Sequence, residues 1–93
     1  MGYRVIKTKR FNKDIKTCIK RNNNISLLSE IIDNYLLKDI SIPEKYYDHS
    51  LKGDYIGKRE CHIQPDWLLI YEIDCDNLII YLVRTGTHSD IFC

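Results

Sequence analysis

Three runs with the character of strands in the second half of the chain are separated by turns that leave room only for a reversal of direction. The runs cover residues 56–63, 67–73 and 78–84, and the turns are residues 64–66 and 74–77. Polar and apolar residues alternate in the first run, which is typical of a half-buried strand. Consecutive strands joined by such short turns pair antiparallel, so the sequence predicts a three-stranded meander.

In the first half of the chain, apolar residues recur at the spacing typical of amphipathic helices. After a short strand over residues 3–7, Thr8 is the expected N-cap of a helix that runs to about Arg21. A turn at residues 22–24 leads to a second predicted helix over residues 25–37. Each helix has one apolar stripe, and the short connection favours an antiparallel helical hairpin.

The order strand, helix, helix and three strands predicts an α+β fold. The helical hairpin would pack on one face of a small twisted antiparallel sheet and leave the other face free as a working surface. A chain of 93 residues has room for one core, so we expect a single domain over residues 1–93. Apolar residues in the segment 38–56 show neither the helical nor the strand spacing. An irregular segment of this length in a small domain more often has a function than not.

Composition narrows the class of protein. The chain is 44% hydrophobic and 29% charged, which is ordinary for a soluble globular domain. Its apolar runs are far too short to cross a membrane, and no signal peptide is visible, so a cytoplasmic protein is expected. The four cysteines have no CxxC spacing and are expected to be reduced.

The net charge of +1 does not indicate a nucleic-acid-binding protein, but basic residues crowd the first quarter of the chain. Asp14 is the only acidic residue among them. The cluster is either a solvated helix face or a patch that faces phosphate groups. The basic residues are Arg4, Lys7, Lys9, Arg10, Lys13, Lys16, Lys20 and Arg21.

Groups that exchange protons near neutral pH are concentrated around the predicted meander. The chain has three histidines, His49, His62 and His88. Alternation puts Glu60 on the same face as His62, and Asp66 begins the return strand near it. Arg84 ends the last strand, and Gly86 permits a sharp exit from the sheet. We therefore expect these side chains to meet on the uncovered face of the sheet.

Such a set could cleave RNA. Imidazoles, with a pKa of about 6.5, can serve as the base and the acid. Arg84 could stabilise the charged phosphorane, and Phe92 could stack on a base; Trp67 could stack too, or belong to the core. Alternatively, the three histidines and Asp66 bind a metal, although no HxH or HxxxH pair is present.

Several short motifs from Asp48 onward resemble those of the YafQ-type toxins of the RelE/ParE superfamily. They are Asp48-His49, LKG at 51–53, RECH at 59–62, PDW at 65–67, LIY at 69–71, RTGTH at 84–88, and Phe92. The resemblance implies a RelE-like β-α-α-β-β-β fold. It also implies the toxin of a type II toxin–antitoxin system, an endoribonuclease that cleaves mRNA, typically in the ribosomal A site, without a metal or other cofactor.

The resemblance also implies a set of functional residues. The expected catalytic residues are His49, His62, Asp66, Arg84 and His88, and the expected substrate contacts are Glu60, Phe92, Lys52 and Arg59. His88 is the expected general acid, and His49 or His62 the base, with Asp66 orienting an imidazole. Position 60 departs from the family pattern, with Glu where Asp is common.

The implied partners are mRNA, the ribosome and a small cognate antitoxin encoded beside the toxin. Operator DNA would be reached only through the antitoxin, and no membrane is involved. Three other interpretations remain open: a non-catalytic ParE-like toxin that binds gyrase, a metal-dependent nuclease, and an inactive relative.

Overall fold

Residues 2–92 are described by a computed structural model, whose centre is a five-stranded sheet in the order β1-β5-β4-β3-β2. The strands are β1 (Arg4–Lys7), β2 (His49–Ser50), β3 (Arg59–Gln64), β4 (Trp67–Asp74) and β5 (Ile79–Gly86). The α-helices are α1 (Lys9–Lys20), α2 (Ile25–Ile31) and α3 (His88–Phe92). A π-helical turn, η1 (Ile32–Leu36), continues α2, and two 3-10 turns, η2 (Glu44–Tyr46) and η3 (Gly53–Tyr55), follow it. The predicted α+β fold is confirmed, and the predicted strand, two helices and three strands occur in the predicted order, with β2 and α3 in addition.

The sheet differs from the prediction in its two outer strands. β1 pairs with β5 in parallel, so the sheet is mixed and the predicted all-antiparallel arrangement is wrong at this edge. Parallel strands need a long crossover connection, which the helices and the following segments supply. At the other edge, the short β2 was not predicted, because two residues give no periodic signal. It pairs antiparallel with β3 and places His49 opposite Glu60.

Local capping explains where the helices begin. The Thr8 side chain accepts a hydrogen bond from the Phe11 N–H at 3.0 Å, as predicted for the N-cap of α1. The same hydroxyl donates to the Val83 carbonyl at 2.9 Å, which ties the start of α1 to β5. Asn24 caps α2 by accepting from the Ser26 N–H at 3.1 Å. The second helix therefore begins where predicted.

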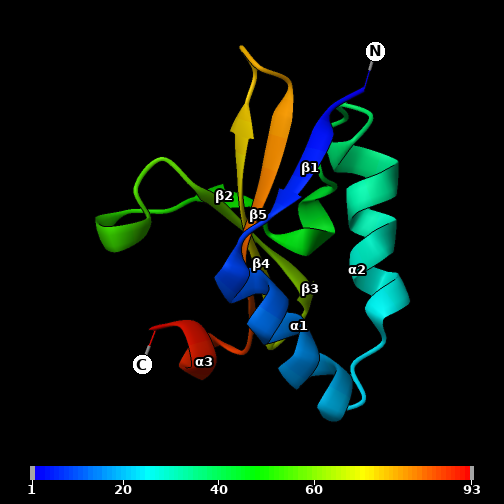
Figure 1. The fold of residues 1–93 in the computed structure, drawn as a ribbon, viewed down its shortest axis with the longest axis vertical. Helices are drawn as coiled ribbons and strands as arrows, with labels where there is room; N and C mark the ends of the chain where they lie inside the picture. The colour runs from blue at the N-terminus through cyan, green and yellow to red at the C-terminus, as the bar shows by residue number, and fades with distance from the viewer. Residues whose placement is uncertain (1, 93) are drawn as a thin grey trace.

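The two faces of the sheet have separate apolar clusters. The larger cluster joins α1 and α2 to one face; it includes Phe11, Cys18, Leu28, Ile31, Cys61, Leu69, Tyr71, Ile80 and Leu82. On the opposite face Leu68 and Ile70 are buried by Ile91 of α3, with Leu51 and Tyr55 packed beside them. Figure 1 shows α2 and α3 at opposite sides of the sheet. The prediction of a bare second face is therefore wrong.

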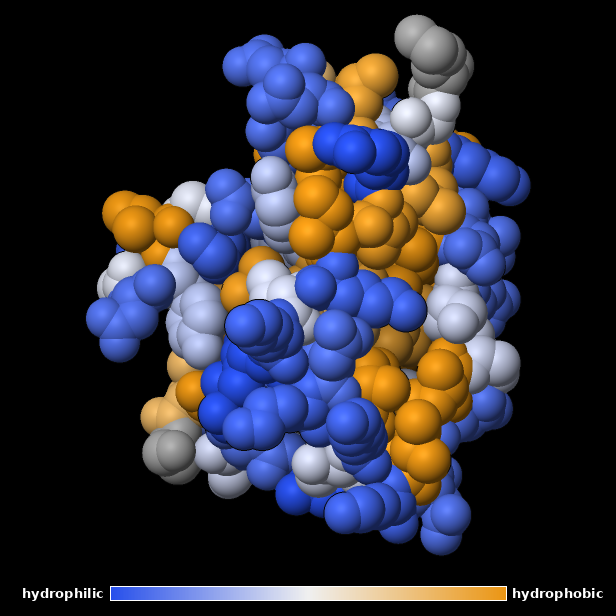
Figure 2. Space-filling view, in the orientation of Figure 1, coloured by the Kyte–Doolittle hydropathy of each residue, from blue (hydrophilic) through white to orange (hydrophobic). Residues whose placement is uncertain are grey.

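The basic residues of α1 lie on its outer surface. Lys9, Arg10, Lys13, Lys16 and Lys20 are all exposed. In Figure 2 hydrophilic side chains cover α1, and hydrophobic side chains gather between it and α2. Within residues 2–92, no helix is long and apolar enough to cross a membrane.

Candidate active site

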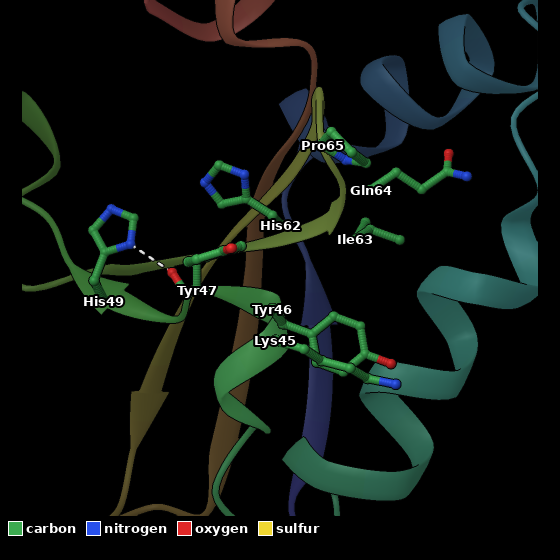
Figure 3. A pocket seen from close by; sticks show the side chains of 8 residues that line it. All are labelled: Lys45, Tyr46, Tyr47, His49, His62, Ile63, Gln64 and Pro65. Atoms are coloured by element: carbon green, nitrogen blue, oxygen red, sulfur yellow. Dashed lines mark hydrogen bonds between the residues drawn. The ribbon is translucent and has the colours of Figure 1, made fainter.

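β2 and β3 place two imidazoles against one carboxylate. The Glu60 Oε1 atom is 3.7 Å from His49 Nε2 and 3.4 Å from His62 Nε2. The two rings are 6.4 Å apart between centroids, and Figure 3 shows them on the same side of neighbouring strands. The Glu60 side chain is only 6% exposed, whereas those of His49 and His62 are 50% and 30% exposed. A buried carboxylate thus supports two accessible imidazoles, here called the histidine pair.

A backbone carbonyl fixes the ring of His49. His49 Nδ1 lies 2.7 Å from the Tyr47 carbonyl oxygen, the contact drawn as a dashed line in Figure 3. A carbonyl oxygen only accepts hydrogen bonds, so the proton must be on Nδ1. In the neutral ring, Nε2 then has a free lone pair, which is the state that a general base requires.

The histidine pair borders an open pocket of about 800 Å³. It is lined by Lys45, Tyr46, Tyr47, His49, His62, Ile63, Gln64 and Pro65. Sites for small ligands commonly have volumes of about 300–1,000 Å³, with apolar walls and a few polar groups. This pocket has that character, because aromatic and apolar walls adjoin the two imidazoles.

The third histidine is presented by α3. Gly86 leaves the sheet with φ of 154°, and a Cβ there would lie 2.9 Å from Asp90 Oδ2, so this position requires glycine. Thr87 and Asp90 then cap each other: the Thr87 N–H donates to Asp90 Oδ2 at 2.9 Å, and the Asp90 N–H donates to Thr87 Oγ1 at 3.0 Å. This turn exposes His88, whose ring lies 4.8 Å from that of Phe92 between centroids.

Asp66 supports His88 and not the histidine pair. Its Oδ1 atom accepts a hydrogen bond from the His88 backbone N–H at 3.2 Å. The expected contact between Asp66 and an imidazole ring is not among the hydrogen bonds and ion pairs of residues 2–92. Asp66 instead fixes the first residue of α3 to the turn between β3 and β4.

Arg84 differs most from its expected place. Its side chain is 11% exposed and pairs with Asp14 of α1, with Nε–Oδ2 and Nη2–Oδ1 distances of 2.8 and 3.3 Å. The guanidinium also donates to the Asp90 carbonyl at 3.3 Å and lies 3.4 Å from the Tyr55 hydroxyl. These contacts raise the pKa of Arg84, chiefly through Asp14. Arg84 therefore joins α1, β5 and α3 and is not the open cation that the sequence predicted.

Two other expected contacts also lie apart from the histidine pair. Arg59 points to the opposite face of β3 from His62, where it donates to Asp48 Oδ2 at 3.1 and 2.8 Å. Asp48 also accepts from the hydroxyl of the core residue Tyr71, whose pKa is raised by burial and then by this carboxylate. Lys52 is exposed just before η3. Arg59 thus braces the segment that leads into β2.

Sequence reasoning missed the supporting residues Asp14 and Asp90. Asp14 lies three residues after Phe11 and four before Cys18, which puts it on the buried stripe of α1. An acidic residue on an apolar stripe signals a buried partner. Asp90 occupies the third position of a helix capped by Thr87, which is a recognisable capping-box position.

Protonation of Asp90 at low pH should destabilise α3. Hydrogen bonds from Arg21, and then from the Thr87 N–H, hold the pKa of Asp90 well below its usual range. A carboxyl whose pKa is lowered by folding stabilises the protein above its unfolded pKa of about 3.9, and this contribution is lost as the pH falls through the folded value. The Tm difference between the native chain and Asp90→Asn should therefore narrow as the pH is lowered from about 5 to about 2. A difference that stays constant over this range would contradict the assignment, and Asp76→Asn in an exposed turn is the control.

Groups suited to proton transfer and to stacking thus flank the turn between β3 and β4. His62 is paired with Leu68, and Leu68 with Gly86, two residues before His88. Two strand spacings of about 4.8 Å separate the His62 and Gly86 backbones by about 10 Å. Among residues 2–92, no set of three or more His, Cys, Asp or Glu side chains is arranged to hold a metal ion.

Comparison with known proteins places the chain in a family. The model of the family described as "Bacterial toxin of type II toxin-antitoxin system, YafQ" matches residues 3–93. The mRNA interferase toxin YafQ of Escherichia coli is 35% identical over 82 residues, which cover 88% of this chain and 87% of that protein.

Solved structures agree in fold. The toxin in the E. coli DinJ-YafQ toxin-antitoxin complex is 30% identical, with full coverage of both chains and a TM-score of 0.88. A metal-bound toxin from Helicobacter pylori is 38% identical, with a TM-score of 0.88, over 97% of this chain and 99% of that chain. From these matches, the chain belongs to the YafQ toxins of bacterial type II toxin–antitoxin systems.

Proposed function

We propose that this YafQ toxin is an endoribonuclease that cleaves mRNA on the ribosome by acid–base catalysis without a metal. The observation that carries this proposal is the histidine pair, two accessible imidazoles within 3.7 Å of one buried carboxylate. Imidazole is the side chain best suited to exchange protons near neutral pH. The similarity to an E. coli mRNA interferase supports mRNA as the substrate.

The reaction begins with attack by the ribose 2′-oxygen on the adjacent phosphorus. His49 Nε2 takes the 2′-OH proton, because its Nδ1 is already committed to the Tyr47 carbonyl. The P–O5′ bond breaks, and His88 gives a proton to the departing 5′-oxygen. The products are a 2′,3′-cyclic phosphate and a 5′-hydroxyl. His62, when protonated beside Glu60, stabilises the charged phosphorane between the two.

The remaining residues hold the reacting groups or the substrate. Asp66 positions His88 through its backbone N–H, and Phe92, which is 40% exposed, stacks on a base. Arg84 acts through α3 and supports His88 without contact to the phosphate. Lys52 contacts the RNA backbone from the exposed loop. Arg59 acts indirectly, by holding Asp48 and thus the start of β2.

The proposed partners are the ribosome and a cognate antitoxin. The exposed lysines of α1 provide a positive surface for ribosomal RNA, whose phosphates attract such a stripe. The E. coli relative forms a complex with the antitoxin DinJ. An acidic or amphipathic antitoxin would complement this surface. A pull-down from the native host that returned no such protein would count against this partner.

Cleavage by purified components tests the proposed reaction. Translating ribosomes programmed with mRNA are incubated in magnesium buffer with toxin that has first been treated with EDTA and desalted, or with untreated toxin. We expect cleavage in both cases, and fragments that end in 2′,3′-cyclic phosphate. Loss of cleavage by the EDTA-treated toxin, restored by an added transition metal, would support a metal-dependent nuclease instead. This alternative is tested because a similar toxin from H. pylori has been solved with a bound metal. Intact mRNA under all conditions would refute the ribonuclease.

A further inference from the structure

Tyr47 is an exposed aromatic residue whose conformation the core does not explain. Its φ and ψ are 52° and 41°, the left-handed region, which bulky L-residues seldom adopt. The residue is 69% exposed, so its ring contributes little to apolar burial. Backbone strain at a non-glycine residue persists only where its surroundings hold it and is concentrated at functional sites.

The same residue adjoins both members of the histidine pair. Its carbonyl oxygen orients His49, and its ring centroid lies 5.7 Å from that of His62, in an edge-on arrangement. In Figure 3 Tyr47 lies next to both imidazoles, whereas Tyr46 extends toward the helices. Tyr46 lies 6.2 Å from Tyr35 between ring centroids and packs against the core. The left-handed turn at Tyr47 thus separates a core aromatic from an exposed one.

We propose that Tyr47 stacks on the base of the nucleotide next to the cleaved phosphate, on the His49 side, and so acts as a substrate-binding residue. The inference rests on the proposed ribonuclease function. The Phe92 ring lies 4.8 Å from the His88 ring between centroids, and the Tyr47 ring likewise lies close to the His62 ring, at 5.7 Å. Each of the two nucleosides joined by the phosphate then has its own aromatic ring, and the phosphate is held between them.

The pocket fits a single-stranded base better than a protein side chain. It opens directly onto the imidazoles that would handle the ribose and phosphate, so a base seated there stays attached to the reacting group. Lys45, whose Nζ atom is 5.0 Å above the Tyr46 ring, supplies a positive charge at its wall for a neighbouring phosphate. Stacking of single-stranded bases on aromatic rings is tolerant of sequence, because every base has a π-face.

The substitution Tyr47→Asn separates a role in RNA binding from a role in folding. Asparagine is among the non-glycine residues that best tolerate the left-handed region, and it removes the ring. We expect the Tm to stay the same or rise, while the affinity for RNA falls about ten-fold or more. Tyr47→Phe keeps the ring and should bind RNA as the native chain does. The Tyr47 carbonyl that orients His49 is kept in both variants.

Affinity is measured by fluorescence anisotropy with a short RNA oligonucleotide that carries 2′-O-methyl groups. This probe lacks the attacking hydroxyl and remains intact, so it reports binding even when cleavage fails. Unchanged affinity in Tyr47→Asn overturns the inference, as does absence of binding by the native chain. A drop in antitoxin affinity without a drop in RNA affinity also overturns it and points to a protein contact. Failure of the native chain to cleave mRNA refutes the ribonuclease separately.

Discussion

Replacing His88 by alanine is expected to slow mRNA cleavage by about 100-fold or more and to leave the Tm nearly unchanged. A positioned general acid contributes about 10²–10⁴-fold to a rate, and His88 is the imidazole proposed for the departing 5′-oxygen. Its ring is exposed and contacts Phe92, so its removal leaves no buried cavity. The bond from its backbone N–H to Asp66 remains in the variant. Single-turnover cleavage on programmed ribosomes measures the effect.

The neighbouring substitution Ser89→Ala is the matched control, because Ser89 is exposed on the same turn of α3. It should cleave at the native rate. A His88→Ala protein that cleaves within a few-fold of the native rate would remove His88 from the chemistry. A large drop in Tm would show instead that the variant loses activity by unfolding α3.

The largest effect on stability is expected from Asp14→Asn, which should lower the free energy of unfolding by about 3 kcal/mol. Asp14 is 8% exposed and neutralises the buried Arg84, so its loss leaves an uncompensated guanidinium. The carboxylate also accepts the Thr85 N–H at 3.1 Å. For a domain of this size, 1 kcal/mol shifts the Tm by roughly 4–8 °C, so thermal unfolding resolves the change easily.

The control for this change is Asp76→Asn, an exposed position where a surface substitution should alter stability by less than about 0.5 kcal/mol. A loss of less than about 1 kcal/mol in the free energy of unfolding for Asp14→Asn would mean that the pair of Asp14 and Arg84 is already solvated.

The substitution Arg84→Lys distinguishes a structural role of Arg84 from a catalytic one. It keeps the charge but loses the two-pronged geometry, so the Tm should fall while cleavage well below the Tm is retained.

Features specified by neighbours in sequence were predictable. The N-cap at Thr8, the exit from the sheet at Gly86 and the meander all follow from residues within a few positions of one another. The shared face of Glu60 and His62 follows from the two-residue period of a strand. Those local rules placed Glu60 and His62 on one face of β3 but did not place His49, because β2 is only two residues long.

Features that depend on distant parts of the chain were not predictable. The partner of Arg84 lies 70 residues earlier, on α1, and no local pattern connects them. The parallel pairing of β1 with β5 is likewise unspecified by any turn. The burial of the second face by α3 and the loop before β3 depended on a five-residue helix, which is too short to show a period.

The parallel pairing of β1 and β5 also divides the proposed site into two parts that depend on different contacts. Arg4 meets Ile79, so this edge of the sheet forms only when segments from both halves of the chain come together. Arg21, which follows α1, pairs with Asp90 of α3, and Asp14 of α1 pairs with Arg84 of β5, so the placement of α3 depends on the first quarter of the chain. The histidine pair is built on the neighbouring strands β2 and β3, whereas His88 follows β5. The proposed site therefore has one part that rests on local strand pairing and one part, around His88, that is complete only when distant segments have assembled.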